Sequence, residues 1–337
     1  MFQVFLRGLP EGTQKATCVC WARVCLCGEG AEGKVKMAAP VASDAHGEVE
    51  EARVVYRRDY SQVSDEPVSQ FGSQGSRVGQ FKFPSSVACT SRGEIVVADC
   101  NNHRVQVFNR NGKFLFKIGG PKSRNGNSQF SFPSGVTVDQ RNNNQIVVAD
   151  SWNHRIQVFD EKGTFLRVLG SSGNGDGQFA YPYSVVVDQQ GNYVVTDKNK
   201  HRIQILTCRG EFVRKFGSNG EENGQMKYPC GVGVLSNGNI VVSEYSGERL
   251  QIFDSQGNFV RIVGAGQFKN PYHLFVDSDD NILVADYGND RIQVFHQNGD
   301  HIKTIGTGQV SHPYGVCMDR EGRIIVCESD NHRISIF

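Results

Sequence analysis

Six acid–arginine pairs are the first residues in this chain whose types and spacing could do chemistry. In each pair an arginine follows a carboxylate by five residues, and an apolar run such as EIVVAD ends at the acid. The pairs are Asp99–Arg104, Asp150–Arg155, Asp197–Arg202, Glu244–Arg249, Asp286–Arg291 and Glu328–Arg333. One such pair could act in acid–base catalysis. A pair that recurs in every repeat is instead expected to stabilise the structure of the repeat. We expect the acid to accept N–H bonds of a tight turn and the arginine to pair with carboxylates between repeats.

Histidine and cysteine are the other residues with chemical potential. His103, His154, His201 and His332 each precede an arginine of the repeat, one repeat apart, so the pattern favours hydrogen bonding over metal binding. Cys18, Cys20, Cys25 and Cys27 form CxC-x4-CxC, which is not the spacing of common zinc modules. The remaining cysteines occupy different offsets in the repeat and predict no disulfide framework. We therefore predict no metal, no cofactor and no catalytic residues.

The elements that position these residues form a repeat of four short apolar runs separated by Gly, Asn and Asp. A proline stands fifteen residues before the acid in five of the six copies, and at seventeen in the copy with Pro133. Repeat length varies almost only between the fourth run and the next proline, which takes twelve residues from Gly170 to Pro182 but seven from Gly264 to Pro271. A fixed four-strand frame with one elastic loop is typical of a β-propeller.

The chain ends indicate that the propeller closes into a ring. The last repeat stops at Phe337 after three runs, and PVSQFGSQG (67–75) matches the fourth run FVRKFGSNG (212–220). The sequence therefore predicts an all-β, six-bladed β-propeller of four-stranded antiparallel blades, with an N-terminal strand completing the last blade. We expect a disordered tail over 1–64 and the propeller over 65–337, with repeats at about 80–119, 129–170, 178–217, 225–264, 267–306 and 309–337 and the closing strand at 67–72.

Composition limits the class of partner. The chain has 36 Lys and Arg against 35 Asp and Glu, which argues against a globally basic nucleic-acid binder and against DNA as a ligand. No apolar run approaches the ~18 residues of a membrane span, and the N-terminus lacks a signal-peptide pattern. The expected compartment is the cytoplasm.

Functional differences between repeats should lie in the loops after the second and fourth runs, because alternating strand direction brings both to one face. We call this the top face. Aromatic and amide side chains gather in these loops, with Lys and Arg in the first three repeats and mostly Asp and Glu in the last three. The candidate partner-binding residues are Arg77, Lys82, Lys122, Arg124, Trp152, Tyr183, Lys198, Asn199, Lys200, Tyr245, Tyr272, His273, Tyr287 and Tyr314.

The repeats resemble NHL repeats, most clearly where SFPSGVTVDQ (131–140) leads into NQIVVADSWNHRIQVFDEKGTFLRVLGSSG (144–173). The resemblance covers about 65–337 and is closest to the tripartite-motif NHL and Brat-like propellers. It implies a non-catalytic module that binds single-stranded RNA or a protein partner on the top face, in post-transcriptional regulation or as the target-recognition part of a ubiquitin ligase.

Two enzyme readings stay open beside this one. Residues 1–64 match no RING or B-box spacing, so a ubiquitin-ligase activity is implied only through the family or with an added RING. The alternative is a metal-dependent lyase, because NHL-like propellers include one. It would need His and carboxylates at strand starts, where only His273 and His312 stand.

Overall fold

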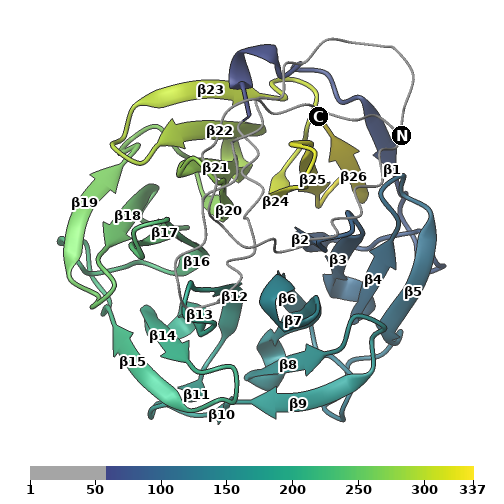
Figure 1. The fold of residues 1–337 in the computed structure, drawn as a ribbon, viewed down its shortest axis with the longest axis horizontal. Coiled ribbons are helices and arrows are strands. Elements are labelled where there is room, and N and C mark those ends of the chain that lie inside the picture. Colours follow the sequence, from purple (N-terminus) through teal and green to yellow (C-terminus); the bar gives the residue numbers. More distant parts are fainter. Residues whose placement is uncertain (1–57) are drawn as a thin grey trace, which may run out of the picture. The chain divides into compact units, whose positions relative to one another are not determined.

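The computed structural model describes residues 58–337, so the predicted cysteine cluster and most of the predicted tail lie outside the described residues. The described residues form six four-stranded antiparallel sheets arranged around a central axis, which confirms the predicted propeller (Figure 1). In each blade we name the strands a to d in chain order. The a strands of neighbouring blades contact one another around the axis.

The blades follow the chain in order. Blade 1 contains β2 (Pro84–Cys89), β3 (Ile95–Asp99), β4 (Arg104–Phe108) and β5 (Phe114–Gly119), and blade 2 contains β6 (Pro133–Asp139), β7 (Gln145–Asp150), β8 (Arg155–Phe159) and β9 (Phe165–Leu169). Blade 3 contains β12 (Pro182–Val187), β13 (Tyr193–Asp197), β14 (Arg202–Leu206) and β15 (Phe212–Phe216), and blade 4 contains β16 (Pro229–Val234), β17 (Ile240–Glu244), β18 (Arg249–Phe253) and β19 (Phe259–Val263). Blade 5 contains β20 (Pro271–Val276), β21 (Asn281–Asp286), β22 (Arg291–His296) and β23 (His301–Ile305).

Blade 6 is built from both ends of the propeller. It contains β24 (Pro313–Met318), β25 (Ile324–Glu328) and β26 (Arg333–Ile336), and β1 (Ser69–Phe71) supplies its fourth strand. The pairing is antiparallel, with Ser69 opposite Ile336 and Phe71 opposite Ile334. Because this strand comes from the other end of the propeller, the ring has no end blade that needs a cap.

Hydrophobic clusters between adjacent blades hold the ring together. The b strands are buried along nearly their whole length because each blade is covered on both faces, as in β3 and β7. The residue three positions before each proline fills the space under the d–a loop. Phe130 is fully buried, and a Cβ on Gly119, whose φ is +85°, would lie 2.7 Å from its ring. Only glycine fits there, because both the space and the positive φ exclude a side chain.

Short 3-10 helices form most of the b–c turns, and each ends in a left-handed residue. They are η2 (Cys100–Asn102), η4 (Ser151–Asn153), η5 (Lys198–Lys200) and η6 (Tyr287–Asn289). The left-handed residue is His103, His154 or His201 in the first three blades and Asp290 in blade 5. Elsewhere, η3 (Gln140–Asn142) extends the a–b turn of blade 2, and β10 (Ser171–Ser172) pairs with β11 (Gln178–Phe179) in the loop before blade 3.

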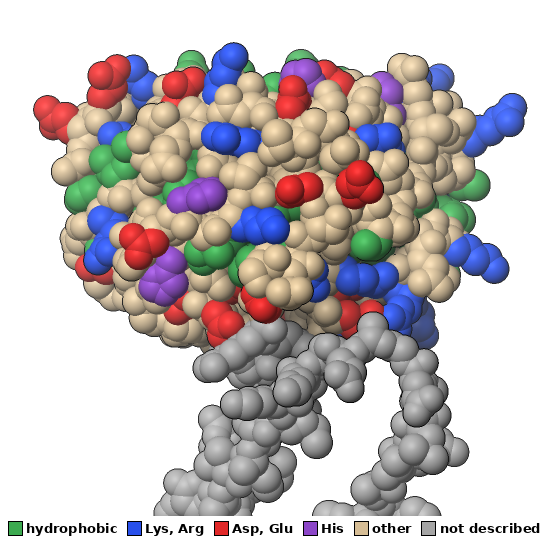
Figure 2. All heavy atoms as spheres, turned by 90° about the horizontal axis from the view of Figure 1, so that it is seen from above, with side chains coloured by type: hydrophobic (Ala, Val, Ile, Leu, Met, Phe, Trp, Pro, Cys, Tyr) green, Lys and Arg blue, Asp and Glu red, His purple; other side chains and the backbone are tan. Residues whose placement is uncertain are grey.

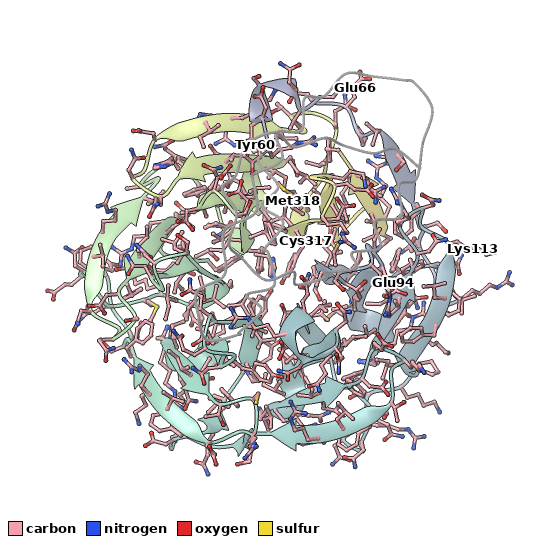
Figure 3. All side chains as sticks on the ribbon, viewed as in Figure 1. Tyr60, Glu66, Glu94, Lys113, Cys317 and Met318 are labelled. Atoms are coloured by element: carbon pink, nitrogen blue, oxygen red, sulfur yellow. The ribbon has the colours of Figure 1, made fainter. Side chains whose placement is uncertain are left out.

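Residues before position 65, where the repeats predict that the propeller begins, also pack onto the blades. Tyr60 opens η1 (Tyr60–Gln62) and is buried, with its hydroxyl donating to Asp277 at 2.6 Å (Figure 3). Val63 is also buried in the cluster between blades 5 and 6, and its carbonyl accepts from Lys303 Nζ at 2.8 Å. These residues lie outside the repeat pattern, so repeat length could not reveal their packing. No helix among residues 58–337 is long and apolar enough to cross a membrane.

Candidate functional site

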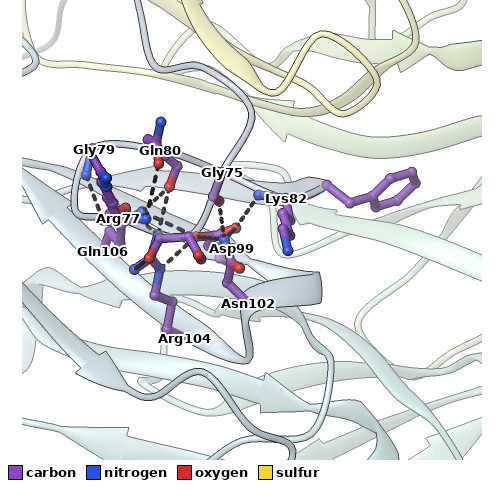
Figure 4. Close-up of polar contacts among 12 residues, drawn as sticks. Gly75, Arg77, Gly79, Gln80, Lys82, Asp99, Asn102, Arg104 and Gln106 are labelled. Carbon is purple, nitrogen blue, oxygen red and sulfur yellow. Dashed lines mark hydrogen bonds and ion pairs between the residues drawn. The ribbon is translucent and has the colours of Figure 1, made fainter.

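The acid–arginine pair joins the strands of a blade to its covering loop. In blade 1 the Asp99 carboxylate accepts from the backbone N–H of Lys82 at 2.7 Å and from Arg104 Nε at 2.7 Å (Figure 4). It also accepts from the side chains of Asn102 and Gln106. The Arg104 guanidinium then donates to the carbonyls of Ser76, Arg77 and Gln80 at 2.7–2.9 Å. Every donor near the carboxylate is therefore used for structure, as the recurrence of the pair suggested.

Two details of that expectation were wrong. Each arginine pairs with the acid of its own blade, as in Arg155 with Asp150 at 2.8 Å, and not with carboxylates of other blades. The acid accepts the N–H of a residue before the proline instead of a b–c turn N–H, because the two loops lie against each other. The spacing of five residues places the arginine directly opposite the acid in the hairpin, where Asp150 and Arg155 are register partners.

The predicted histidines connect neighbouring blades. His103 Nδ1 accepts from the N–H of Phe132 in the next blade at 3.2 Å, and His201 does the same for Tyr228 at 3.1 Å. His332 closes the circle by accepting from Phe83 at 3.2 Å. Among residues 58–337 no three His, Cys, Asp or Glu side chains gather as a metal site would require. These histidines are hydrogen-bonding residues of the frame.

The two sets of loops share one face, as predicted. The N–H of Asn101 in the b–c turn of blade 1 donates to Lys82 O in the preceding loop at 3.0 Å, and Lys198 N donates to Tyr181 O in blade 3 at 3.0 Å. The b–c turns and the d–a loops therefore form the top face together. The a–b and c–d turns form the opposite face.

An aromatic plug fills the axis at this face. Its core is Tyr183, Cys230 and Tyr314, with Phe83, Tyr181, Tyr245, Tyr272 and Tyr287 packed around it. The rings of Tyr272 and Tyr314 stack with centroids 3.8 Å apart, and the hydroxyls of Tyr183 and Tyr314 hydrogen-bond to each other. Burial raises the pKa of both hydroxyls well above 10, so they stay protonated.

One lysine of the candidate set belongs to this plug. Lys198 Nζ lies 4.3 Å from the Tyr183 ring centroid and 5.1 Å and 5.3 Å from those of Tyr245 and Tyr272. Three rings around one ammonium group give a cation–π site that the chain fills itself. Lys198 is half-buried, whereas its neighbours Asn199 and Lys200 are exposed at the turn tip.

Three candidate residues lie beneath the surface that a partner could touch. Tyr183, Tyr314 and His273 are 7–8% exposed. His273 takes the second position after the proline of blade 5, where blade 1 has Ser86. Its ring reaches the Val316 carbonyl at 3.2 Å and Ser86 Oγ at 3.5 Å, and burial lowers its pKa to about 4. It is a neutral core residue, and none of the described carboxylates contacts it, whereas the lyase hypothesis requires histidines accompanied by carboxylates.

The remaining basic candidates form a sector over blades 1 to 3. Arg77, Lys82, Lys122, Arg124 and Lys200 are exposed, and no described carboxylate lies in ion-pair contact with them. Asp176 is the sole acid in the top loops of these blades, and it pairs with Lys215 at 2.6 Å. We call these five residues and Lys198 the basic sector.

An aromatic platform stands inside the basic sector. Trp152 is 58% exposed, its ring lies 4.8 Å from that of Phe132, and its Nε1 donates to Tyr181 Oη at 3.0 Å. Sequence reasoning selected Trp152 but not Phe132. The position of Phe132 before a proline was the available signal, because that residue lies beside the next b–c turn.

The other half of the top face has the opposite sign. Glu221, Glu222, Glu248, Asp290 and Asp330 lie in the loops of blades 4 to 6, with Lys227 and Lys269 as the basic exceptions. Lys227 is ion-paired with Glu221. Seen edge-on, acidic and basic side chains are interspersed on the visible rim, with only scattered hydrophobic groups (Figure 2). On this visible rim the two signs are therefore not separated as they are in the top loops.

Known proteins share these repeats and this fold. The NHL repeat family matches residues 81–108, 130–159, 179–206 and 311–337. The chain is 40% identical over 101 residues to protein brain tumor of Drosophila melanogaster, covering 30% of this chain and 10% of that protein. It is 33% identical over 103 residues to the mouse E3 ubiquitin-protein ligase TRIM32, covering 28% of this chain and 16% of that protein.

A likeness to a solved enzyme concerns the fold alone. A streptogramin B lyase structure superimposes with a TM-score of 0.58 over 80% of this chain and 96% of that one, at 13% identity. The chain contains NHL repeats in blades 1, 2, 3 and 6, and its sequence is similar over 101 residues to the brain tumor protein and over 103 residues to TRIM32.

Proposed function

We propose that this propeller is a non-catalytic recognition module that binds single-stranded RNA across the basic sector. The observation that carries the proposal is the juxtaposition of unpaired cations with the platform of Trp152 and Phe132 in blades 1 to 3. Phosphates meet Lys and Arg on such a surface while unpaired bases stack on aromatic rings. The role in the cell that this favours is post-transcriptional regulation in the cytoplasm.

Local charge makes this possible despite a formal net charge of only +1. The top loops of blades 1 to 3 carry six Lys or Arg and one acid, Asp176, which Lys215 neutralises. An exposed cation without an intramolecular partner is free to meet a phosphate, and releasing counterions from the RNA drives the contact. The basic sector can therefore supply affinity for RNA, although the formal net charge of the whole chain is close to zero.

A protein partner is the second candidate, and the acidic half of the top face favours it. Two-signed surfaces give orientation and specificity between proteins. One relative is an E3 ubiquitin-protein ligase by name. In that setting the propeller would choose targets for ubiquitination and proteasomal degradation, while catalysis would reside in another domain or chain.

RNA binding is tested with the full chain and a labelled pool of random single-stranded RNA at two salt concentrations. The test variant is Lys122→Glu/Lys200→Glu, and the control is Lys113→Glu/Lys162→Glu, which makes the same charge change at exposed c–d turns of the opposite face. We expect salt-dependent binding that falls at least about tenfold in the test variant and is retained in the control. No binding at low salt, or equal losses in both variants, contradicts the proposal.

A further inference from the structure

Blades 4 and 5 hold the same acid–arginine pair under loops of different length. Twelve residues separate Gly217 from Pro229 before blade 4, but only seven separate Gly264 from Pro271 before blade 5. The pairs themselves are alike, with Nε–carboxylate distances of 2.8 Å for Arg249 and 2.9 Å for Arg291. The difference between the blades is therefore in what covers the arginine.

The long loop before blade 4 provides more hydrogen-bond acceptors for the Arg249 guanidinium than the short loop before blade 5 provides for Arg291. Arg249 donates to the carbonyls of Glu221, Glu222 and Gln225. Arg291 donates to one loop carbonyl, that of Gln267 at 2.9 Å, and no described residue accepts from its Nη1. Its side chain is 30% exposed, against 14% for Arg249.

A groove lies where the longer loop would be. Its volume is about 760 Å³, and Arg291, Lys269, His301, Gln293 and Glu248 are among the residues that line it. The His301 ring faces Thr304 Oγ1 at 3.1 Å inside the same groove. The lining is polar and offers free N–H donors beside one carboxylate, so it suits a ligand that presents oxygen acceptors.

We propose that this groove binds an extended peptide segment of a partner protein that carries a carboxylate side chain flanked by basic residues. The carboxylate takes the free Arg291 Nη1–H and the Lys269 ammonium. Carbonyls of the peptide replace the loop carbonyls that Arg249 has in blade 4. The basic flanks meet Glu248, whose carboxylate lines the groove. This site is distinct from the basic sector, because it lies between blades 4 and 5 on the acidic half.

Charge favours a peptide over a nucleic acid here. Arg291 is already paired with Asp286, whose side chain is fully buried, and Glu248 adds a further negative charge to the lining. A chain of phosphates would meet the Glu248 carboxylate at close range, whereas a single carboxylate with basic neighbours complements both signs.

The experiment selects random linear peptides displayed on phage against the full chain, then measures synthetic versions of the winners by fluorescence anisotropy. The first variant replaces residues 264–270 with the blade 4 loop, residues 217–228, which fills the groove. The second is Lys269→Glu, an exposed change that leaves the frame intact. The third is Arg291→Lys, which keeps a charge opposite Asp286 but loses the planar fork.

We expect winners with Asp or Glu between basic residues, and at least a tenfold loss of peptide affinity in all three variants. RNA binding by the basic sector should be unchanged in them, so failure of this site and failure of the RNA proposal are separable. The inference is overturned if no acidic motif is selected, if Lys269→Glu and the loop replacement both leave affinity intact, or if single-stranded RNA displaces the peptide and is itself lost in the loop replacement.

Discussion

Blade 1 and blade 5 have the same strands and the same acid–arginine pair, yet one is sealed and the other is open. Arg104 is 4% exposed and donates to three loop carbonyls, whereas Arg291 is 30% exposed and donates to one. The acid is fully buried in both. The same arrangement of strands therefore carries two different surfaces, because the loop before the a strand differs in length between the two blades.

The same pair of blades differs at the axis. Ser86 of blade 1 is small and donates to the Val136 carbonyl of blade 2, while His273 of blade 5 reaches past blade 6 to Ser86 itself. One large side chain therefore fills a space left by small ones. The comparison teaches that repeated residues build the ring, and that departures from the repeat decide what each sector can bind.

The largest expected contrast comes from removing the arginine in each blade. Arg104→Ala leaves Asp99 buried and uncompensated under a closed loop, so we expect a loss of about 3–5 kcal/mol in unfolding free energy. Arg291→Ala should cost only about 1–2 kcal/mol, since water in the groove can take the vacated place. Urea unfolding of both variants measures the difference. Equal losses would mean that the loop does not seal the pair.

The next contrast is in pH dependence at the axis. The pKa of His273 is about 4 in the fold, because burial disfavours the charged ring, against 6.5 for an ordinary histidine. Between these values the unfolded chain binds a proton that the folded chain does not, so stability falls as pH drops from about 6.5 to about 4. His273→Gln removes this contribution while keeping an amide that can hydrogen-bond.

We therefore expect the stability advantage of the parent over His273→Gln to shrink by on the order of 2–3 kcal/mol between neutral pH and pH ~4. Because the two chains differ at one residue only, the contribution of carboxylates that titrate in the same pH range to the change in stability cancels in the comparison. Chemical unfolding at a series of pH values provides the measurement. A gap that does not change with pH would show that the ring is solvated or charged in the fold.

Sequence reasoning anticipated the frame better than the surface. The six repeats, the ring closure through residues 67–72 and the shared top face followed from spacing, because repeats that bury one another fix their own geometry. The burial of Tyr183 and Tyr314 could not be predicted from the sequence. A tyrosine beside a proline gives the same sequence pattern whether its ring is packed in the core or exposed to solvent. The short loop before Pro271 was visible in the sequence, but the donors it frees appear only when the acceptors of each arginine are known.

A smaller contrast concerns exposed aromatics in the two halves of the top face. Trp152 in the basic sector and Tyr228 in the acidic half are 58% and 43% exposed. Trp152→Ala should weaken RNA binding by about 1–3 kcal/mol because it removes a stacking surface, while Tyr228→Ala should leave it unchanged. Anisotropy titrations with one RNA at fixed salt compare them. A loss in Tyr228→Ala as large as that in Trp152→Ala would place RNA over both halves.

The smallest effect separates lysines that meet phosphate from lysines that do not. Lys122 is exposed in the basic sector without an ion pair to a described residue, whereas Lys227 is already paired with Glu221. If Lys122 contacts one phosphate, Lys122→Gln should reduce the slope of log affinity against log salt by about 0.7, the value for a single contact on single-stranded nucleic acid. Lys227→Gln should leave the slope alone. Equal slopes in all three proteins would show that Lys122 is merely solvated, and the RNA path would then have to run through Arg77, Lys82 and Lys200 instead.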